Sequence, residues 1–207
     1  DAERTMNTFL GASDTLSSKE IDQEALLGSE WLYVEGYLVT DKARTKVTKE
    51  AVEFAKHHGV KIAISLSDLF LAEVFGDALR DVMGSYVDLI FCNIDEALAF
   101  TGSKDLDSAI EKLKLVTKAF AITDGAHGAI TFDGESILRT NAVPAKAIDT
   151  NGAGDMFAGA FLYAITSGKG YDWAAKLAND CASRVVTKFG PRLGPEDFSE
   201  IKAKFGI

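Results

Sequence analysis

Along the chain, short runs of apolar, β-branched and aromatic residues alternate with longer segments whose apolar residues recur every three or four positions. The short runs predict β-strands, and the longer segments predict amphipathic helices. The predicted strands are MNTFLGA (6–12), EWLYVEGYLV (30–39), KIAISLS (61–67), VDLIFCN (87–93) and AFAITDG (119–125). The predicted helices cover residues 18–27, 42–58, 69–83 and 105–117, with a short one directly after Asn93. This alternation is typical of parallel strands joined by crossover helices.

The pattern changes in the last third of the chain. Asp133-Gly134 stands between two β-like runs, which predicts a hairpin over residues 129–140. A short strand at AKAI (145–148) then precedes three helices without intervening strands, the last from Pro195 to Lys204. The apolar faces of the first two helices predict core packing. We therefore expect a single α/β domain over residues 1–207, with helices on both faces of a mostly parallel sheet.

Composition narrows the class of partner. The chain has 207 residues, of which 47% are hydrophobic and 26% charged, as in globular proteins with a sizeable core. Its net charge of −9 argues against nucleic acid or an anionic membrane as a partner. A bound phosphate would therefore depend on local backbone amides and helix dipoles. No run reaches the length of a membrane span. Cys92 and Cys181 form neither a disulfide framework nor a zinc pattern, which favours a reducing, cytoplasmic location.

The segment from Asp149 to Asp155, DTNGAGD, joins a predicted strand to a predicted helix. Gly152 and Gly154 permit a tight turn and a close approach of the backbone to a ligand. The helix N-terminus offers unpaired N–H groups and the positive end of the helix dipole, which favour an anion. Asp155 is placed to accept a proton from an alcohol that attacks a phosphoryl group held there. The same pattern is also typical of a glycine turn whose acid favours a helix start.

Two further stretches follow predicted strands. Asn93 and Glu96 have the spacing of a capping box, and the same pair is suited to orienting the water shell of Mg²⁺. Thr123, Gly125 and Gly128 are typical of a turn, and they are also suited to form a backbone wall for a nucleotide. Ligands of parallel sheets bind at the carboxyl ends of strands, which is where all three stretches are predicted to lie.

Several familiar motifs are absent. SGKG around Lys169 is not a Walker A loop, because Tyr163 stands at the position of the first glycine and Gly170 replaces the Ser/Thr. No G-x-G-x-x-G, G-x-S-x-G or H-E-x-x-H motif occurs. Dinucleotide-binding proteins, nucleophile-elbow hydrolases and zinc proteases therefore lack their usual signals.

DTNGAGDMFAGAFL (149–162) is similar to the C-terminal signature of the PfkB/ribokinase family of carbohydrate and nucleoside kinases. NIDE (93–96) resembles the family's Asn-x-x-Glu motif, and TDGAHGA (123–129) resembles its Thr-x-Gly nucleotide segment. The order and spacing of these stretches also fit, and the resemblance covers essentially the whole chain. MNTFLGAS and YVEGYL look more like the adenosine-kinase-like branch than like ribokinase itself.

The resemblance implies a three-layer α/β/α ribokinase-like fold, ATP and Mg²⁺ as cofactors, and a primary alcohol of a sugar or nucleoside as acceptor. It implies that Asp155 deprotonates the acceptor hydroxyl. The implied anion hole consists of the amides of Gly152, Ala153 and Gly154. The implied magnesium and phosphate residues are Asn93 and Glu96, and the implied nucleotide residues are Thr123, Gly125, Gly128 and Asn179. Many relatives hold a monovalent cation, usually potassium, at the positions of Asp149 and the loop around Gly190.

Family members also have an N-terminal part with the first strands, a glycine-pair signature, an acceptor-binding acid and a small β lid, and none of these occurs here. We therefore expect that the N-terminal strands and lid are missing, that DAERTM (1–6) is the strand returning from the lid, and that this piece alone is a poor catalyst.

A homodimer is compatible with the sequence. The alternatives are a non-catalytic nucleotide-binding or regulatory domain of the same fold, a kinase for a hydroxymethylpyrimidine-type acceptor, and a hydrolase without a visible nucleophile–base pair.

Overall fold

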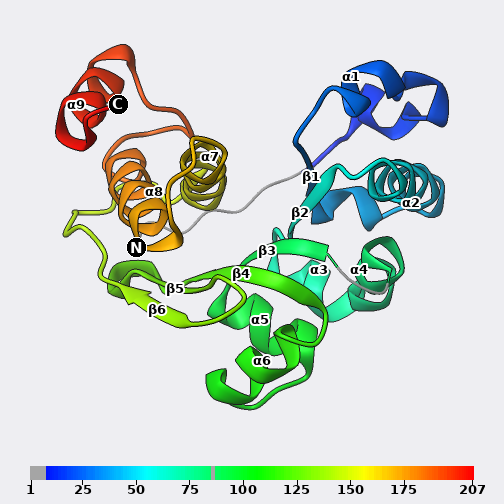
Figure 1. The fold of residues 1–207 in the computed structure, drawn as a ribbon, viewed down its shortest axis with the longest axis horizontal. Coiled ribbons are helices and arrows are strands. Elements are labelled where there is room, and N and C mark those ends of the chain that lie inside the picture. Colours follow the sequence, from blue (N-terminus) through cyan, green and yellow to red (C-terminus); the bar gives the residue numbers. More distant parts are fainter. Residues whose placement is uncertain (1–7, 85–86) are drawn as a thin grey trace. The chain divides into compact units, whose positions relative to one another are not determined.

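The computed structural model describes residues 8–84 and 87–207, which fall into two compact units (Figure 1). The N-terminal unit comprises Thr8–Ile122, and the C-terminal unit contains Thr123–Ile207. The expectation of a single domain over the whole chain stays a prediction.

The N-terminal unit is built on β-strands. They are β1 (Trp31–Glu35), β2 (Lys61–Ser65), β3 (Val87–Asn93) and β4 (Thr117–Thr123), of which Thr123 already belongs to the C-terminal unit. The strands follow one another in chain order, and β2 runs parallel to both β1 and β3. The register places Glu35 opposite Ser65, and Ser65 opposite Phe91. The parallel α/β arrangement predicted from the hydrophobic pattern is therefore confirmed.

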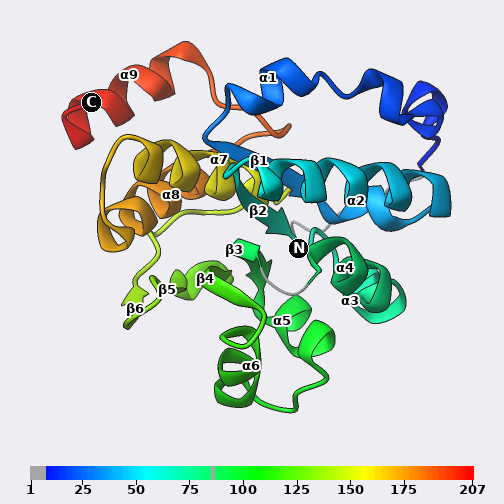
Figure 2. The same ribbon diagram turned by 45° about the vertical axis from the view of Figure 1, so that its right-hand side comes forward.

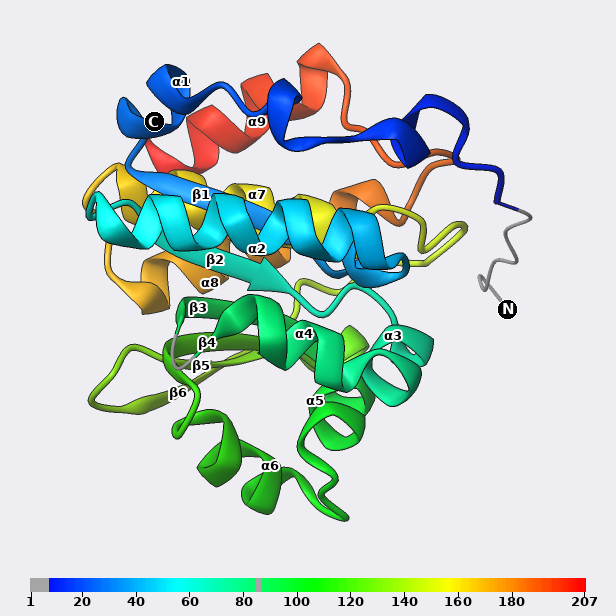
Figure 3. The same cartoon turned by 90° about the vertical axis from the view of Figure 1, so that its right-hand side faces the viewer.

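One helix of this unit precedes β1, and the others lie between successive strands as crossover connections. They are α1 (Gln23–Leu27), α2 (Lys42–His57), α3 (Leu69–Val74), α4 (Gly76–Met83), α5 (Ile94–Thr101) and α6 (Leu106–Leu113). Helix α2 lies alongside β1 and β2 (Figure 3). Its N-terminus is capped by the Asp41 carboxylate, which accepts hydrogen bonds from the amides of Ala43 and Arg44. Ile62 and Leu89 are fully buried in the core that these elements form.

Five predicted elements of this unit need correction, including the strand at 30–39 that is described below. Of the predicted strand at 6–12, residues 6 and 7 lie outside the described residues; the remainder has no strand, and a 3-10 helix (Gly11–Thr15) begins there. The predicted helix at 18–27 is a 3-10 turn (Ser18–Glu20) followed by α1. The one at 69–83 breaks into α3 and α4 at Phe75. The one predicted at 105–117 ends at Leu113, because Thr117 already starts the next buried strand.

The strand predicted over 30–39 ends at Glu35, and a 3-10 helix (Gly36–Val39) follows. At this point the backbone of Gly36 presses against the turn after β2. A Cβ on Gly36 would lie 2.7 Å from the carbonyl oxygen of Leu66. The close approach of two backbones, which only glycine permits, thus ends the strand earlier than the apolar pattern indicates.

The C-terminal unit contains a hairpin and a group of helices. Strands β5 (Ala129–Phe132) and β6 (Ile137–Thr140) are antiparallel, as predicted, and the Asp133 side chain accepts hydrogen bonds from two amides of the connecting turn. The helices are α7 (Ala153–Thr166), α8 (Tyr171–Val185) and α9 (Pro195–Phe205). Helices α7 and α8 pack side by side (Figure 2). Their buried residues include Phe157, Phe161 and Ala178, which confirms the predicted core faces.

The strand predicted at 145–148 is wrong. These residues are exposed and irregular, although the apolar alternation of AKAI favoured a strand. The amide of Ile148 donates instead to the carbonyl of Val186 at 2.7 Å, at the end of α8. The segment is therefore part of a loop that is fastened to the C-terminus of a helix.

Candidate functional site

The loop before α7 makes a left-handed turn at Gly152. This residue is the N-cap of α7, with φ 78° and ψ 4°. A Cβ at this position would lie 2.4 Å from the Cβ of Pro191. Glycine is therefore required both by the backbone conformation and by the space available.

Asp149 fastens this loop to the segment after α8. One carboxylate oxygen accepts a hydrogen bond from the amide of Asn151 at 2.9 Å, and the other accepts one from the amide of Gly190 at 2.9 Å. The structure thus brings Asp149 next to the loop around Gly190. Pro191, which limits the space at Gly152, belongs to the same loop. No local sequence signal indicated that proline, because it lies far along the chain.

The first turn of α7 presents amides and a carboxylate. The amide of Ala153 donates to the carbonyl of Thr150 at 3.2 Å, whereas the amides of Gly154 and Asp155 have no protein acceptor among the described residues. Asp155 is exposed in this first turn. The turn therefore combines unpaired N–H groups at the positive end of the helix dipole with an accessible carboxylate. Three amides were predicted to form the anion hole. One of them, the amide of Ala153, already donates a hydrogen bond within the loop.

Asn93 and Glu96 form the capping box that their spacing predicted. The Asn93 side chain accepts from the Glu96 amide at 2.8 Å, and the Glu96 carboxylate accepts from the backbone and side-chain amides of Asn93 at 3.0 and 2.8 Å. This reciprocal pair starts α5 at the carboxyl end of β3. Both polar side chains are therefore held in fixed positions at that end of the strand.

Glu96 is unusual because its carboxylate is buried. Burial raises the pKa of Glu96 to about 7, against the hydrogen bond from the Asn93 backbone, and the charges of Asp68 and Asp95 raise it further. The side chain has no cationic partner within the described part of the chain, and the residue is only 6% exposed. A buried carboxylate close to other acids and without a protein cation is a place where a divalent cation would be stabilised.

Thr123 ends β4 and leads into a turn that two glycines shape. Gly125 has φ 50° and Gly128 has φ 107°, both in the left-handed region. A Cβ on Gly128 would lie 2.0 Å from the carbonyl oxygen of Thr140 and 2.6 Å from the amide nitrogen of Ala142. The turn therefore lies directly against the backbone that follows β6.

Asn179 contacts the same backbone from α8. Its side-chain amide donates to the carbonyls of Thr140 and Asn141, at 3.3 and 3.2 Å, and the residue is buried. The structure thus gathers Gly128, Asn179 and the segment after β6 into one packed arrangement. That segment was not found from the sequence, since its role rests on contacts with distant residues. Asn93 and Glu96 belong to the N-terminal unit, and the other candidates belong to the C-terminal unit.

Two kinds of feature are absent from the described residues. These residues contain no group of three or more His, Cys, Asp or Glu side chains arranged to hold a metal ion. None of their helices has the length and apolar character required to cross a bilayer.

Comparison with known proteins identifies the family. The model of the pfkB family of carbohydrate kinases matches residues 1–197. The chain belongs to this family. Its predicted membership of the PfkB/ribokinase family and its ribokinase-like α/β fold are thereby confirmed.

Solved structures of two relatives superpose closely on the chain. The adenosine kinase of Sinorhizobium meliloti is 33% identical, with a TM-score of 0.93 over 99% of this chain and 63% of the relative. A probable sugar kinase of Rhizobium etli CFN 42 is 31% identical, also with a TM-score of 0.93, over 100% of this chain and 63% of the relative. The adenosine kinase of Schizosaccharomyces pombe is 30% identical, over 92% of this chain and 61% of its own length. The chain thus spans a little over three fifths of the length of these pfkB relatives.

Proposed function

We propose that the chain carries the phosphate-handling part of an ATP-dependent kinase that transfers the γ-phosphoryl group to a primary alcohol of a sugar or nucleoside. One observation carries this proposal, namely the geometry of Gly152 to Asp155. A glycine held in the left-handed conformation starts α7, unpaired amides follow it, and an exposed carboxylate lies in the same turn. Membership of the pfkB family supports the reaction class.

Asp155 is the proposed general base. Its exposed position allows it to approach an acceptor hydroxyl, and it has no ion-pair partner among the residues that the structure describes. Phosphoryl transfer passes through a loose, highly charged transition state, so a weakly basic carboxylate suffices if the proton leaves late. The role of Asp155 is to orient the hydroxyl and to take its proton.

The proposed anion hole is the start of α7. The amides of Gly152 and Gly154, with that of Asp155, are available to donate to phosphoryl oxygens, since none of them has a protein acceptor in the described segments. The Ala153 amide would contribute if its turn bond to Thr150 opened. Donors fixed in advance toward developing negative charge stabilise the transition state without reorganisation.

Asn93 and Glu96 fit the proposed magnesium and phosphate role. Their capping box fixes both side chains, and the buried Glu96 carboxylate has no cationic partner among the residues that the structure describes. Mg²⁺, when bound with ATP, would neutralise phosphate charge in the transition state.

The nucleotide is proposed to lie on the turn formed by Thr123, Gly125 and Gly128. Asn179 stabilises this turn indirectly. Its side-chain amide donates hydrogen bonds to the carbonyls of the backbone segment against which Gly128 packs. A monovalent cation near Asp149 is proposed as well. Both oxygens of that carboxylate already accept hydrogen bonds from backbone amides. Asp149 would therefore shape such a site chiefly by fixing the loop before α7. A cytoplasmic location and a homodimer stay predictions.

The alternative is a nucleotide-binding or regulatory domain without catalysis. Such a domain needs the phosphate-binding loop, but it does not need an exposed carboxylate in the first turn of α7. Asp155 is exposed at this point and forms no ion pair in the described parts of the chain, so its interaction with the helix dipole is the structural contribution that remains. The kinase is therefore the better supported proposal.

An acceptor screen tests the proposed function. Protein from the complete gene would be incubated with ATP, Mg²⁺ and a panel of sugars and nucleosides, and phosphorylated product would be measured. We expect transfer to at least one primary alcohol, and we expect Asp155→Asn to lower turnover by about 10²-fold or more. Nucleotide binding without transfer to any acceptor would favour the regulatory alternative. Near-normal turnover by Asp155→Asn would remove Asp155 as the base.

A further inference from the structure

Ser67 has a backbone conformation that serine rarely adopts. Its φ of 70° makes it the sole non-glycine residue in the left-handed region within residues 8–84 and 87–207. It lies in SLSD (65–68), directly after β2. Strained positions of this kind persist where the surrounding structure fixes them, and they are concentrated at functional sites.

Hydrogen bonds hold the Ser67 turn from two sides. The Ser67 hydroxyl accepts from the amide of Gly36 at 2.8 Å, and the Ser67 amide donates to the hydroxyl of Ser65 at 3.1 Å. The Tyr37 hydroxyl donates to the Ser67 carbonyl at 3.2 Å. The turn is therefore tied to the segment after β1, where Gly36 brings its backbone against Leu66. Glycine at position 67 would relieve the backbone strain, but it would lose the acceptor for the Gly36 amide.

The strand register places this turn beside the Asn93 capping box. Ser65 is opposite Phe91, and the Leu66 amide donates to the Phe91 carbonyl at 2.9 Å. Ser67 and Asn93 therefore both lie two residues beyond a paired position. The turn thus reaches the same level of the sheet edge as the start of α5.

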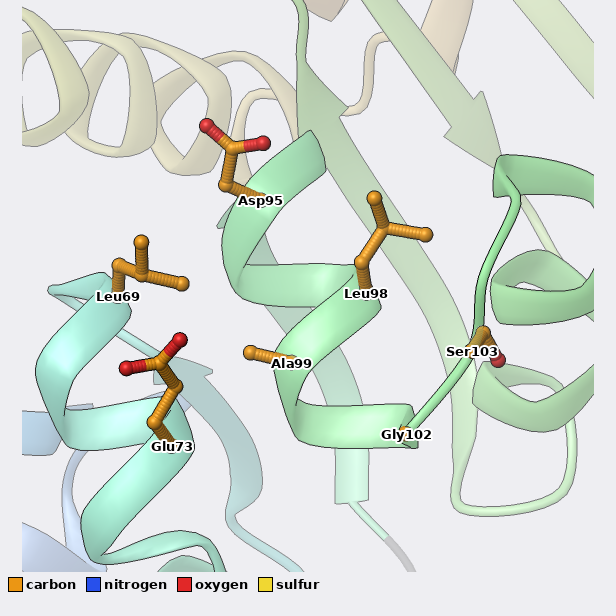
Figure 4. Close-up of a pocket in the computed structure, with 7 residues that line it drawn as sticks. All are labelled: Leu69, Glu73, Asp95, Leu98, Ala99, Gly102 and Ser103. Carbon is orange, nitrogen blue, oxygen red and sulfur yellow. The ribbon is translucent and has the colours of Figure 1, made fainter.

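The residue after Ser67 links the turn to α3. Asp68 is the N-cap of α3, and its carboxylate accepts from the amide of Phe70 at 2.8 Å. Helix α3 packs against α5, and Leu69 and Asp95 line one pocket between these helices (Figure 4). The negative charge of Asp68 contributes to raising the pKa of the Glu96 carboxyl. The position of Asp68 relative to Glu96 therefore depends on the turn that precedes it.

We propose that Ser67 is a positioning residue, whose left-handed turn holds Asp68 and the first turn of α3 beside Asn93 and Glu96. This inference rests on the proposed function, because it assigns the turn to the part of the site that organises magnesium and phosphate. In this proposal Ser67 itself does not contact magnesium or phosphate. It acts by keeping the carboxylates of the N-terminal unit at fixed separations, so that a hydrated divalent cation meets an unchanging set of acceptors.

The test compares Ser67→Gly and Ser67→Ala with a matched control, Ser103→Ala. Ser103 is a half-buried serine of the same unit whose hydroxyl is hydrogen-bonded to Thr101. The thermal unfolding midpoint is measured for each protein. The affinity for Mn²⁺ in the presence of ADP is measured by electron paramagnetic resonance, with Mn²⁺ as the probe. Neither measurement requires turnover.

Ser67→Gly is expected to separate stability from binding. Its unfolding midpoint stays within about 2 °C of the wild type, since relief of strain offsets the lost hydrogen bond. Its affinity for Mn²⁺–ADP falls by about fivefold or more, because Asp68 is no longer held in place. Ser67→Ala keeps the strain and loses the hydroxyl, so both quantities fall. Ser103→Ala changes neither by comparable amounts.

Three outcomes contradict the inference. The first is binding by Ser67→Gly within about twofold of the wild type, which is under half a kcal/mol and leaves only a structural role. The second is an equal loss of affinity in Ser103→Ala, which would make the effect unspecific. The third is the absence of Mn²⁺–ADP binding by the wild-type protein. This last result contradicts the proposed function as well, whereas the first two contradict the role of Ser67 alone.

Discussion

The Asp149 carboxylate accepts a hydrogen bond from the Gly190 amide at 2.9 Å, across a separation of 41 residues. Its other oxygen accepts from the Asn151 amide within the loop before α7. One side chain thus fixes both the start of the proposed anion hole and the segment that carries Pro191. The position of the Gly152 turn depends on this double contact, so changes at Asp149 should alter stability and phosphate binding together.

Asp149→Asn should lower the free energy of unfolding by about 2 kcal/mol, the usual loss for hydrogen bonds to a charged group. An amide has only one carbonyl oxygen, so its NH₂ group would face one of the two backbone donors. Urea denaturation measures the change. Asp22→Asn, which replaces an exposed N-cap of α1 by another good N-cap, is the control and should have little effect. Equal stability of Asp149→Asn and the wild type would show that the two hydrogen bonds of the Asp149 carboxylate contribute little to stability.

Gly152→Ala should destabilise the protein by about 3 kcal/mol or more, because alanine is strained at φ 78° and its Cβ would overlap Pro191. Gly159→Ala is the matched control in the same helix. It has open space around it and should stabilise the protein by about 0.5–1 kcal/mol. Urea denaturation of both variants and the wild type measures these changes in the free energy of unfolding. A mild effect of Gly152→Ala would mean that the Pro191 loop moves away easily.

Glu96→Gln should change how stability depends on pH. The folded state raises the pKa of Glu96 from 4.5 to about 7, so it binds this proton more tightly than the unfolded state does. The stability that the proton contributes is present below pH 4.5 and is lost as the pH rises to about 7. Glutamine can keep the capping box but does not titrate. Without divalent cations, the stability of Glu96→Gln relative to the wild type should therefore rise by about 3 kcal/mol across this window.

Urea denaturation between pH 4.5 and 7.5 measures the effect at Glu96. Glu111→Gln, which replaces an exposed glutamate of α6, is the control and is measured over the same range. Parallel pH profiles of Glu96→Gln and the wild type would show that the Glu96 carboxyl titrates like an exposed group.

Asn179→Ala should lower the free energy of unfolding by about 1–2 kcal/mol, because it leaves the carbonyls of Thr140 and Asn141 without their side-chain donor. Because these carbonyls lie against Gly128, ADP affinity should fall as well. Calorimetric titration with ADP and urea denaturation measure the two effects. Lys176→Ala, on an exposed part of the same helix, should change neither. Full ADP affinity in Asn179→Ala would separate this segment from the nucleotide wall.

Local features of the sequence were predicted well where their cause is local. VDLIFCN coincides with β3, since a continuous apolar run between polar residues is typical of a buried parallel strand. Asn93 and Glu96 form the predicted capping box because both bonds span only three residues. Asp133-Gly134 makes the predicted hairpin turn for the same reason. The glycine-rich loop before α7 could also be identified, since its motif is contiguous.

Contacts between distant segments could not be predicted from these patterns. The apolar alternation of AKAI favoured a strand, but the amide of Ile148 is taken up by the end of α8. The apolar run through Gly36 predicted a strand that continues to residue 39. The backbone of Leu66, however, lies too close to Gly36 for a side chain at that position. Ser67 carried no signal at all, because its left-handed conformation follows from hydrogen bonds to segments beyond its own strand.

The sequence by itself determined the element types, the family motif and the residues that carry the proposed chemistry, because periodicity and short spacings act within a few residues. The tertiary structure alone decided why Gly152 must be glycine, where Asn179 directs its amide, and that Glu96 is buried without a cationic partner in residues 8–84 and 87–207. These properties depend on which distant backbone fills the space beside a residue. Such proximity is set by packing of the whole unit and leaves no trace in a local pattern.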